Sequence, residues 1–591
     1  MAPIIYQNTG PTPWVDVPNL DLLTLLFDSE HAPFQPETPS HLDSQSPTNC
    51  LTRAQLLTLS QRIAHGLRTN HGLGASGLNT DVVTVISYGQ ILVPALFYGV
   101  LIAGGVYSAA SPSSTVGEFA RQIELGKSKL VVISQEFEAL TRETLRLHGQ
   151  RLGIGTENVL VLDSTPDKWS LRTLDSGDSA ISSRLLDWER ITDPKKLKES
   201  LIVILWSSGT TGLPKGVMLS HQNLVCETYL TALSGRAWGE KQLQHDPSWT
   251  PTPYRTLAHL PLSHIAGLFG YIIGPLYSGG LVVWMRKYNW KQFYESVSKF
   301  QITFLYTVPS IFLRIAKSPE VADHFRTVET ANTGAASMDG PLQRAANSKL
   351  GKRVGGVGKE ETFIGQTWGL SETTGAITAQ PKGEVDDTGC IGSVLPNVEI
   401  RQIDTDTLRD VEPGTPGHMV VRSPLVTQGY FGNPEATEKS FVVLPDTPKD
   451  PGEKWFLTGD IAVYRDGKFY IVDREKEILK YKGQQIAPAE VENVLATHEA
   501  VGEAAVVGVE DGGESGAGEV PRAYVVKRPG VEVSEDELKR YVKERMAEYK
   551  QLRGGVVFVD EIPKNAIGKY LRRELRERAK REVGGGVKAR L

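Results

Sequence analysis

A strand-like run that leads directly into a loop of small and hydroxylated residues constrains the fold of this chain most. Residues 201–206 (LIVILW) are all apolar, and a run of this kind predicts a strand buried in a parallel sheet. The next ten residues read SSGTTGLPKG. Glycines let the backbone approach an anion closely, while hydroxyls and an ammonium group donate hydrogen bonds. The pattern therefore predicts a loop that holds phosphate groups.

This loop differs from the nucleotide loop of phosphohydrolases. That signature requires Gly-Lys followed by Ser or Thr, whereas Lys215 follows Pro214 and precedes Gly216. The sequence thus indicates a different nucleotide chemistry.

The order of predicted elements indicates an α/β fold with two domains. Strand-like runs at 82–87, 130–134, 159–162, 201–206, 280–285 and 302–308 alternate with helix-like segments, which is typical of a mostly parallel sheet. Residues 398–421 predict a small β-rich subdomain. After Asp473, strands at 504–509, 523–526 and 556–559 and a helix starting at Ser534, with Glu537 completing a capping box, predict a compact α+β domain. We therefore expect domains at 1–472 and 473–591.

Composition excludes several classes of protein. A net charge of −5 and a pI near 6.2 give no reason to expect a nucleic-acid partner. The three cysteines, Cys50, Cys226 and Cys390, predict a reducing compartment without disulfides. The most apolar stretch, 91–106, is shorter than the roughly 20 residues of a membrane span, so we expect a buried core helix there and no membrane span.

Five segments together resemble the adenylate-forming superfamily, which includes acyl-CoA synthetases, 4-coumarate-CoA ligases, luciferases and the adenylation domains of peptide synthetases. The phosphate loop SSGTTGLPKG is the first. The others are GQTWGLSETT (365–374), LTGD (457–460), DREKEILKYKGQQIAPAEVE (473–492) and PKNAIGKYLRREL (563–575). The resemblance covers about residues 50 to 580 and is closest to the 4-coumarate-CoA ligase-like acyl-CoA ligases. It implies a large N-terminal domain of α/β subdomains and a mobile C-terminal domain.

The resemblance implies a nucleotide site in the large domain. By position, Trp368 would stack on adenine, Ser371 would meet the α-phosphate and Glu372 would hold magnesium. Asp460 would accept hydrogen bonds from the ribose hydroxyls, and Arg474 would also contact the ribose. The remaining cofactor-binding residues implied in this domain are Ser207, Ser208, Gly209, Thr210, Thr211, Lys215, Gln366, Thr367 and, for CoA, Lys287.

The C-terminal motifs imply a lid that carries the catalytic lysine, Lys569. Lys476 would be the hinge residue and Lys480 would touch the adenylate. Lys482 and Gly483 would line the pantetheine tunnel, where a glycine allows close backbone approach because it lacks a Cβ.

The resemblance also implies an acyl pocket gated by His264. Its other residues would be Ala266, Gly270, Ala335 and Thr367. The small residues suggest room for a sizeable acyl group, which Thr367 partly offsets. Plant CoA ligases have glycine at the position of Thr367, so the substrates of the plant enzymes are a weak guide to the substrate of this chain.

The implied activity is that of an acid-CoA ligase that uses ATP, Mg²⁺ and CoA. A carboxylate attacks the α-phosphorus of ATP, pyrophosphate leaves, and the acyl adenylate then passes its acyl group to the thiol of CoA. Two related readings stay open: loading of a separate carrier protein, and luciferase-like oxidation of the adenylate. A third, from another class, is a nucleotide-binding protein without turnover. The acid could be aryl, medium-chain or an intermediate of a biosynthetic pathway.

The last three residues, Ala589, Arg590 and Leu591, resemble the C-terminal Ser-Lys-Leu type of peroxisomal address. We therefore expect recognition by a peroxisomal import receptor and a peroxisomal location, with the cytoplasm as the alternative.

Overall fold

In the computed structural model of this chain, residues 3–10, 13–32, 35–207, 214–336, 338–351, 362–445, 454–474, 477–481, 484–510, 519–564, 568 and 570–587 are described. For Lys480, Gln484, Gln485 and residues 583–587 the description covers the backbone only.

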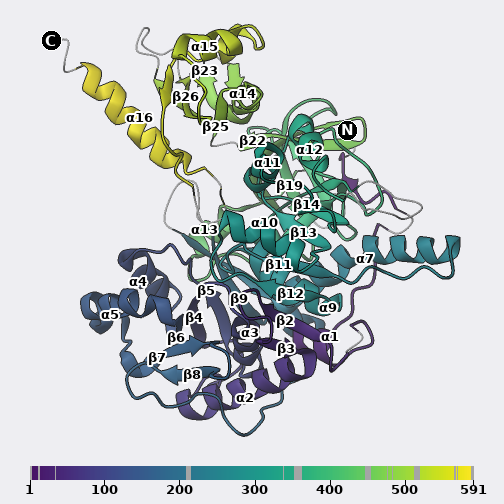
Figure 1. Cartoon of the computed structure of the whole chain (residues 1–591), viewed down its shortest axis with the longest axis vertical. Helices are drawn as coiled ribbons and strands as arrows, with labels where there is room; N and C mark the ends of the chain where they lie inside the picture. The colour runs from purple at the N-terminus through teal and green to yellow at the C-terminus, as the bar shows by residue number, and fades with distance from the viewer. Residues whose placement is uncertain are drawn as a thin grey trace.

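A seven-stranded sheet forms the first half of the large domain, with the order β10-β9-β5-β4-β6-β7-β8 (Figure 1). The inner strands are parallel, and β10 and β8 pair antiparallel at the two edges. The strands are β4 Val82–Ile86, β5 Val106–Ala109, β6 Ser128–Ser134, β7 Val159–Asp163, β8 Ser170–Thr173, β9 Leu201–Ser207 and β10 Lys215–Ser220. The predicted phosphate loop therefore connects β9 to the edge strand β10.

Both faces of this sheet are covered by helices, as the continuous apolar character of its strands requires. On β6, Leu130 and Val132 pack in a cluster with α2 (Arg53–His71) and α3 (Leu92–Ile102). Val131 and Ile133 pack in another cluster with Phe119 of α4 (Val116–Leu125). This alternation follows the two-residue period of a strand. Helix α3 is buried at every residue, which confirms the core helix expected within residues 91–106.

Two further sheets complete the α/β part of the large domain. One has the order β11-β12-β2-β3 and the other β13-β14-β15-β16-β17. Their strands are β2 Pro39–Asp43, β3 Cys50–Thr52, β11 Arg255–Ala258, β12 Leu281–Trp284, β13 Phe304–Thr307, β14 Thr330–Thr333, β15 Ile364–Leu370, β16 Gly375–Ala379 and β17 Ser393–Val394. The expectation that the strands predicted between residues 82 and 308 form one mostly parallel sheet is wrong, because they are divided among three sheets. The strand-like runs at 280–285 and 302–308 join other sheets because β10 pairs antiparallel with β9 and occupies that edge.

The predicted β-rich subdomain is an antiparallel sheet with the order β1-β18-β19-β21-β20, to which β22 is added beside β21. It is larger than residues 398–421 because it recruits β1 from the N-terminus. Its strands are β1 Tyr6–Gln7, β18 Glu399–Ile403, β19 Gly417–Arg422, β20 Phe441–Val442, β21 Trp455–Arg465 and β22 Lys468–Arg474. The predicted domain boundary at 472/473 falls within β22.

Helices connect these sheets, and one of them extends away from the body. Helix α7 (His221–His245) starts at the end of β10, and its second half projects outward in Figure 1. The other helices of the large domain are α1 Leu22–Phe27, α5 Glu138–Leu152, α6 Pro194–Glu199, α8 Ile265–Leu268, α9 Gly274–Tyr277, α10 Trp290–Lys299, α11 Pro309–Lys317, α12 Gly340–Asn347 and α13 Pro434–Glu438. Short 3₁₀ turns lie at η1 Gln135–Phe137, η2 Thr156–Asn158 and η4 Ser371–Thr373, and η3 Phe269–Ile273 is a π-helix.

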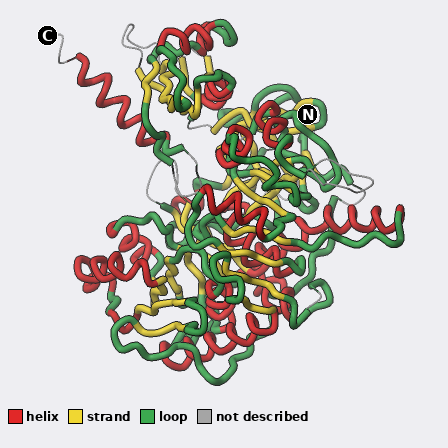
Figure 2. Tube along the Cα trace, viewed as in Figure 1, coloured by secondary structure: helices red, strands yellow, loops and turns green. Residues whose placement is uncertain are grey.

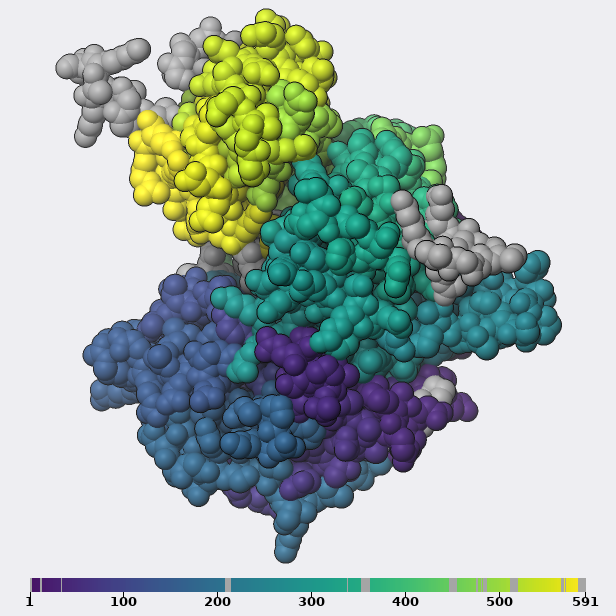
Figure 3. All heavy atoms as spheres, in the orientation of Figure 1, coloured from purple at the N-terminus to yellow at the C-terminus, as the bar shows by residue number. Residues whose placement is uncertain are grey.

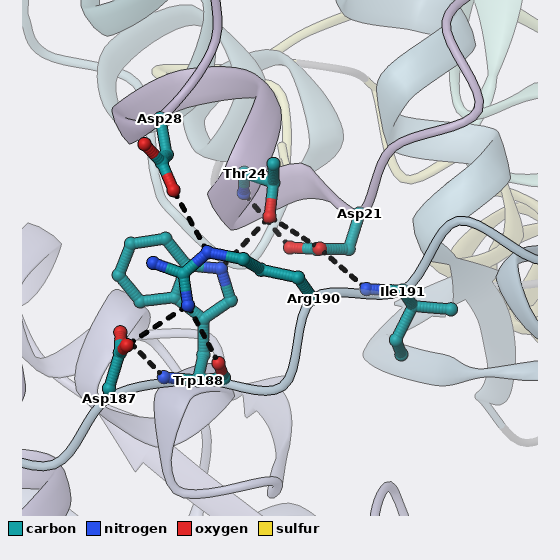
Figure 4. A network of polar contacts seen from close by, with 7 residues as sticks. All are labelled: Asp21, Thr24, Asp28, Asp187, Trp188, Arg190 and Ile191. Atoms are coloured by element: carbon teal, nitrogen blue, oxygen red, sulfur yellow. Dashed lines mark hydrogen bonds and ion pairs between the residues drawn. The ribbon is translucent and has the colours of Figure 1, made fainter.

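A polar network fastens α1 to the segment that precedes α6 (Figure 4). Asp21 caps α1, and its Oδ2 accepts hydrogen bonds from the Thr24 hydroxyl (2.6 Å) and from the Ile191 amide (3.0 Å). The Trp188 indole N–H donates to the Thr24 hydroxyl (3.0 Å), and Arg190 lies 4.5 Å over the Trp188 ring. The network joins residues about 165 positions apart, and no local sequence pattern predicted it.

The C-terminal domain is the smaller body at the upper end of the molecule (Figures 1 and 2). It contains the β23-β24 hairpin and the three-stranded sheet β25-β26-β27. Its elements are β23 Leu479–Tyr481, β24 Gln484–Ile486, α14 Pro488–Ala496, β25 Val501–Glu510, β26 Glu519–Lys527, α15 Glu535–Lys543, η5 Glu548–Lys550, β27 Val556–Phe558 and α16 Arg572–Val587. The space-filling view shows this domain seated on the large domain (Figure 3). The predicted two-domain α/β fold is confirmed.

Ser534 begins α15 as predicted, and its hydroxyl accepts a hydrogen bond from the Glu537 amide at 3.2 Å. The second half of the predicted capping box differs. The Glu537 carboxylate lies 3.7 Å from His498 Nε2, because the neighbouring helix α14 ends beside it.

No helix within the described part of the chain is both long and apolar enough to cross a membrane.

Candidate active site

A cleft of about 3500 Å³ runs between the sheets of the large domain and reaches the C-terminal domain. The sequence-predicted residues that line it come from segments far apart in the chain. They are Ser207, Lys215, His264, Ala266, Gly270, Ala335, Thr367, Ser371, Glu372 and Arg474. Lys564, Leu571 and Glu574 line it from the C-terminal domain. The tertiary structure thus brings the predicted phosphate side and the predicted acyl side into one space.

The phosphate side of the cleft is organised around Tyr430. Its hydroxyl donates to Glu372 Oε1 at 3.0 Å, and Lys215 Nζ lies 4.8 Å over its ring. Burial, together with the charge of Glu372, raises the pKa of Tyr430. Lys215 is paired with Ser207 across β9 and β10. Sequence reasoning missed Tyr430, for which the only local signal is an aromatic pair between Gly429 and Gly432.

Asp460 is held by two of the predicted nucleotide-site residues. The Trp368 indole N–H donates to Asp460 Oδ2 at 2.8 Å, and Arg474 Nε lies 3.0 Å from Asp460 Oδ1. The charge of Asp460 raises the pKa of Arg474. Trp368 is 8% exposed, and its ring packs in an apolar cluster with Ile377. The structure therefore shows a packing contact for this ring, and its stacking on adenine stays a prediction.

The acyl side is formed by segments with unusual backbone geometry. His264 precedes α8, and its Nδ1 accepts a hydrogen bond from the Ala266 amide at 3.3 Å. Gly270 lies in the π-helix η3, a form that is rare and frequent at functional sites. Ala335 has the left-handed value φ 68°. The Thr367 hydroxyl donates to the Thr333 carbonyl at 3.2 Å.

Two predicted site residues, Gln366 and Lys287, contact neighbouring residues of the large domain. The Gln366 side chain donates to the Met338 carbonyl (2.9 Å) and accepts from the Met338 amide (3.1 Å). Lys287 Nζ lies 5.7 Å over the ring of Tyr88. A role for Gln366 in nucleotide binding and for Lys287 in CoA binding stays a prediction.

Several predicted residues lie outside the described residues. They are Ser208, Gly209, Thr210 and Thr211 of the phosphate loop, and Lys476, Lys482, Gly483 and Lys569 of the C-terminal motifs. The peroxisomal tripeptide Ala589, Arg590 and Leu591 also lies outside them, and Lys480 is described only as a backbone position in β23.

Gly568 places the last motif against the large domain. A Cβ at this position would lie 2.9 Å from Ser310 Oγ, near the start of α11, and Gly568 has φ +78°. Nearby, Lys564 lines the cleft and pairs with Glu503 at 2.7 Å. Described residues on both sides of the predicted catalytic lysine, Lys564 and Leu571, thus line the cleft.

A buried ionic cluster lies beside the predicted hinge and was not anticipated from the sequence. Arg572 of α16 contacts Glu477 (3.2 Å) and Glu492 (2.8 Å). Burial raises the pKa of Glu492 to about 7, although Arg572 opposes this shift. The cluster joins α14 and α16 to the residues that follow β22.

Comparison with known proteins agrees with this geometry. The family model described as AMP-binding enzyme matches residues 29–431, and the model described as AMP-binding enzyme C-terminal domain matches residues 490–569. This chain belongs to the AMP-binding enzyme family. The first model covers most of the large domain, and the second covers most of the C-terminal domain.

Relatives of this AMP-binding enzyme are similar over nearly the whole chain. A protein named as an acyl-coenzyme A synthetase from Emericella nidulans is 43% identical over 97% of this chain and 98% of its own length. A phenylacetyl-CoA ligase from Aspergillus niger is 33% identical over 97% and 99%. The crystal structure of ATP-bound MatB from Rhodopseudomonas palustris has a TM-score of 0.77 at 24% identity, covering 95% and 99% of the two chains, and shows the shared fold. The chain is an AMP-forming acid-thiol ligase that uses ATP and CoA.

Proposed function

We propose that this enzyme activates an aryl or medium-chain carboxylic acid as an acyl adenylate and then transfers the acyl group to CoA. The observation that carries this proposal is the single cleft that holds Lys215, Ser371 and Glu372 together with the pocket around His264 and Gly270. A nucleotide on one side and an acid on the other would meet within it.

The first half-reaction needs charge stabilisation and no general base. A carboxylic acid is already ionised at pH 7, so the difficulty is to bring two anions together and to stabilise charge on the phosphoryl oxygens. Lys215 supplies a positive charge beside Tyr430, and Ser371 supplies a hydroxyl in the cleft. These residues would orient the phosphates of ATP while the carboxylate attacks the α-phosphorus and pyrophosphate leaves.

Glu372 fits a role in holding Mg²⁺. In nucleotide sites Mg²⁺ is bound by one or two carboxylates together with phosphate oxygens and water. The Tyr430 hydroxyl fixes one oxygen of Glu372 (3.0 Å), and the residue lines the cleft. Mg²⁺ would neutralise charge on the phosphates there.

Lys569 carries the sharpest prediction for this mechanism. Lys569→Ala is expected to abolish formation of the acyl adenylate, because the lysine would stabilise negative charge in that step, and to spare thioester formation from preformed acyl-AMP. Both half-reactions can be followed separately, by pyrophosphate release and by acyl-CoA formation from synthetic acyl-AMP. Equal loss of both activities would contradict the assignment.

Small residues support the proposed size of the acid. Ala266, Gly270 and Ala335 leave room on the acyl side, and a relative is a phenylacetyl-CoA ligase. The experiment is pyrophosphate release by the purified protein with ATP, Mg²⁺ and a panel of aryl and medium-chain acids, with and without CoA. Acyl-CoA and AMP as products support the proposal. Acyl-AMP that CoA does not consume would contradict it and favour carrier loading or oxidation.

Peroxisomal import is a separate proposal that rests on the tripeptide Ala589, Arg590 and Leu591. A fluorescent reporter that carries the last dozen residues should become punctate and coincide with a peroxisomal marker. A diffuse reporter would favour the cytoplasm.

A further inference from the structure

A buried carboxyl group that the adenylation mechanism does not use lines the cleft. Glu227 of α7 is 2% exposed and lines the cleft. Its Oε1 accepts a hydrogen bond from the Ala376 amide at 2.9 Å. No described residue offers a hydrogen-bond partner to Oε2. A buried polar atom without a partner is costly, so this oxygen calls for one.

Two hydroxyl groups accompany Glu227 on this wall. Tyr306 of β13 and Thr367 of β15 also line the cleft. A Cβ placed on Gly334 would lie 2.6 Å from Tyr306 Oη and 2.8 Å from Thr367 Oγ1, so the two hydroxyls occupy the same small region. Burial raises the pKa of Tyr306, and a side-chain hydrogen bond with Thr367 opposes this shift. The three side chains line the same cleft, and together they are defined here as the acyl-wall cluster.

We propose that the acyl-wall cluster selects acids whose acyl part carries a neutral hydroxyl or carbonyl group, with Glu227 Oε2 as the hydrogen-bonding atom. This inference rests on the proposed acid-CoA ligase function and specifies its substrate class. Glu227 would touch the substrate without taking part in the chemical steps.

The protonation of Glu227 explains why the partner is neutral. Burial raises the pKa of Glu227 well above its usual range, although the hydrogen bond from Ala376 opposes this. The raised pKa favours the protonated, uncharged form of this side chain. Because Oε1 already accepts from Ala376, the proton belongs on Oε2, which then donates to an oxygen of the substrate. An acid that lacks such an oxygen leaves the group unpaired, which is the basis of strong discrimination.

The test compares matched acids in the purified full-length enzyme. Phenylacetate is compared with its 2-, 3- and 4-hydroxy derivatives, and octanoate with its 6-, 7- and 8-hydroxy derivatives. The kcat/KM for acyl-CoA formation is measured for each acid. We expect at least one hydroxylated acid to exceed its parent by about tenfold or more. A ratio near one for every pair, with acyl-CoA formed, would overturn the inference and leave the ligase function intact.

Variants assign the preference to Glu227. Glu227→Leu should bring the ratio to about one, while Glu227→Gln, whose amide still donates, should keep it within about threefold of the parent enzyme. Gln244→Leu, at an exposed position of the same helix that does not line the cleft, should leave the ratio unchanged. A purely structural role would lower activity with all acids and preserve the ratio, which would overturn the inference.

If Glu227→Leu does not fold, the ratios measured for the parent enzyme and for Glu227→Gln still test the inference. Absence of acyl-CoA from every acid would overturn the ligase function and this inference together.

Discussion

Asp460 shows how single residues were both found and missed. Its short motif was enough to identify Asp460 as a candidate site residue. The motif did not predict the residues that contact it: Trp368 is 92 positions away, and Arg474 lies on the neighbouring strand β22. Tyr430 and Glu227 carry no motif and were missed altogether. Only their contacts in the folded chain identify them as candidate site residues, since a tyrosine or a glutamate alone is compatible with any surface or core position.

Asp460→Asn is expected to raise the KM for ATP by about tenfold. The change removes the charge that pairs with Arg474 at 3.0 Å and weakens a charge-assisted hydrogen bond of about 1.5–3 kcal/mol. Steady-state kinetics with varied ATP would measure it. Asp406→Asn, at an exposed position, is the control. An unchanged KM for ATP in Asp460→Asn would contradict the proposed ribose-side role.

At the scale of elements, the segment from His264 to the end of η3 lines the cleft on the predicted acyl side. Sequence reasoning marked its small residues but did not predict a π-helix at Phe269–Ile273. Such a helix depends on how the turn packs against its surroundings, because its apolar residues would also suit an α-helix. Most predicted strands, by contrast, were located within a few residues, since their apolar runs are local signals.

Two glycines in this segment give a matched pair of variants. A Cβ at Gly270 would meet nothing within 4 Å, whereas a Cβ at Gly267 would lie 2.2 Å from the Pro261 carbonyl oxygen. Gly270→Ala should therefore preserve or raise stability by up to about 1 kcal/mol and disfavour the bulkiest acids. Gly267→Ala should lower the free energy of unfolding by roughly 1–3 kcal/mol.

Thermal unfolding and the acid panel would measure both effects. Equal stability of the Gly270→Ala and Gly267→Ala variants would contradict the packing of this segment.

At the scale of the whole molecule, Lys317 links the two domains. Its ammonium group, at the end of α11, donates to the Val501 carbonyl at the start of β25 at 3.2 Å. Burial lowers the pKa of Lys317 to about 8, Arg528 lowers it further, and Glu503 opposes the shift. The sequence pointed to a hinged lid but not to the contacts that hold it in this position.

Lys317→Met should shift the population of domain orientations several-fold away from the one described, because about 1 kcal/mol of hydrogen bonding is lost. Single-molecule energy transfer between dyes on the two domains would measure the shift. Lys291→Met, whose side chain is 73% exposed, is the control. Identical distributions for Lys317→Met and the parent protein would contradict a role for this contact.

Buried histidines predict that the whole molecule loses stability in acid. Burial lowers the pKa of His41 to about 3 and that of His221 and His259 to about 4, with Arg53 lowering His41 further. In the unfolded chain these groups take up protons near pH 6.5. The unfolded state thus binds more protons between about pH 6.5 and 4, so the stability that these histidines contribute is present above this window and falls as the pH drops through it.

His221→Asn keeps an acceptor for the Leu22 amide, which donates to His221 Nδ1 at 3.1 Å. The variant should show a shallower loss of stability, by up to about 1.4 kcal/mol per pH unit. Chemical denaturation at several pH values between 7 and 4.5 would measure the slope. A slope equal to that of the parent protein would rule out His221 as a contributor.

The amino-acid sequence by itself determined the α/β class, the buried strand that precedes the predicted phosphate loop, and the family of chemistry. Those properties depend on residue types within short stretches, where apolar periodicity and the spacing of donors are already visible. Only the tertiary structure decided that Tyr430 reaches Glu372 across 58 positions and that Glu227 contacts Ala376 across 149. Such contacts depend on strand order and on how helices cross the sheets, which no local pattern encodes.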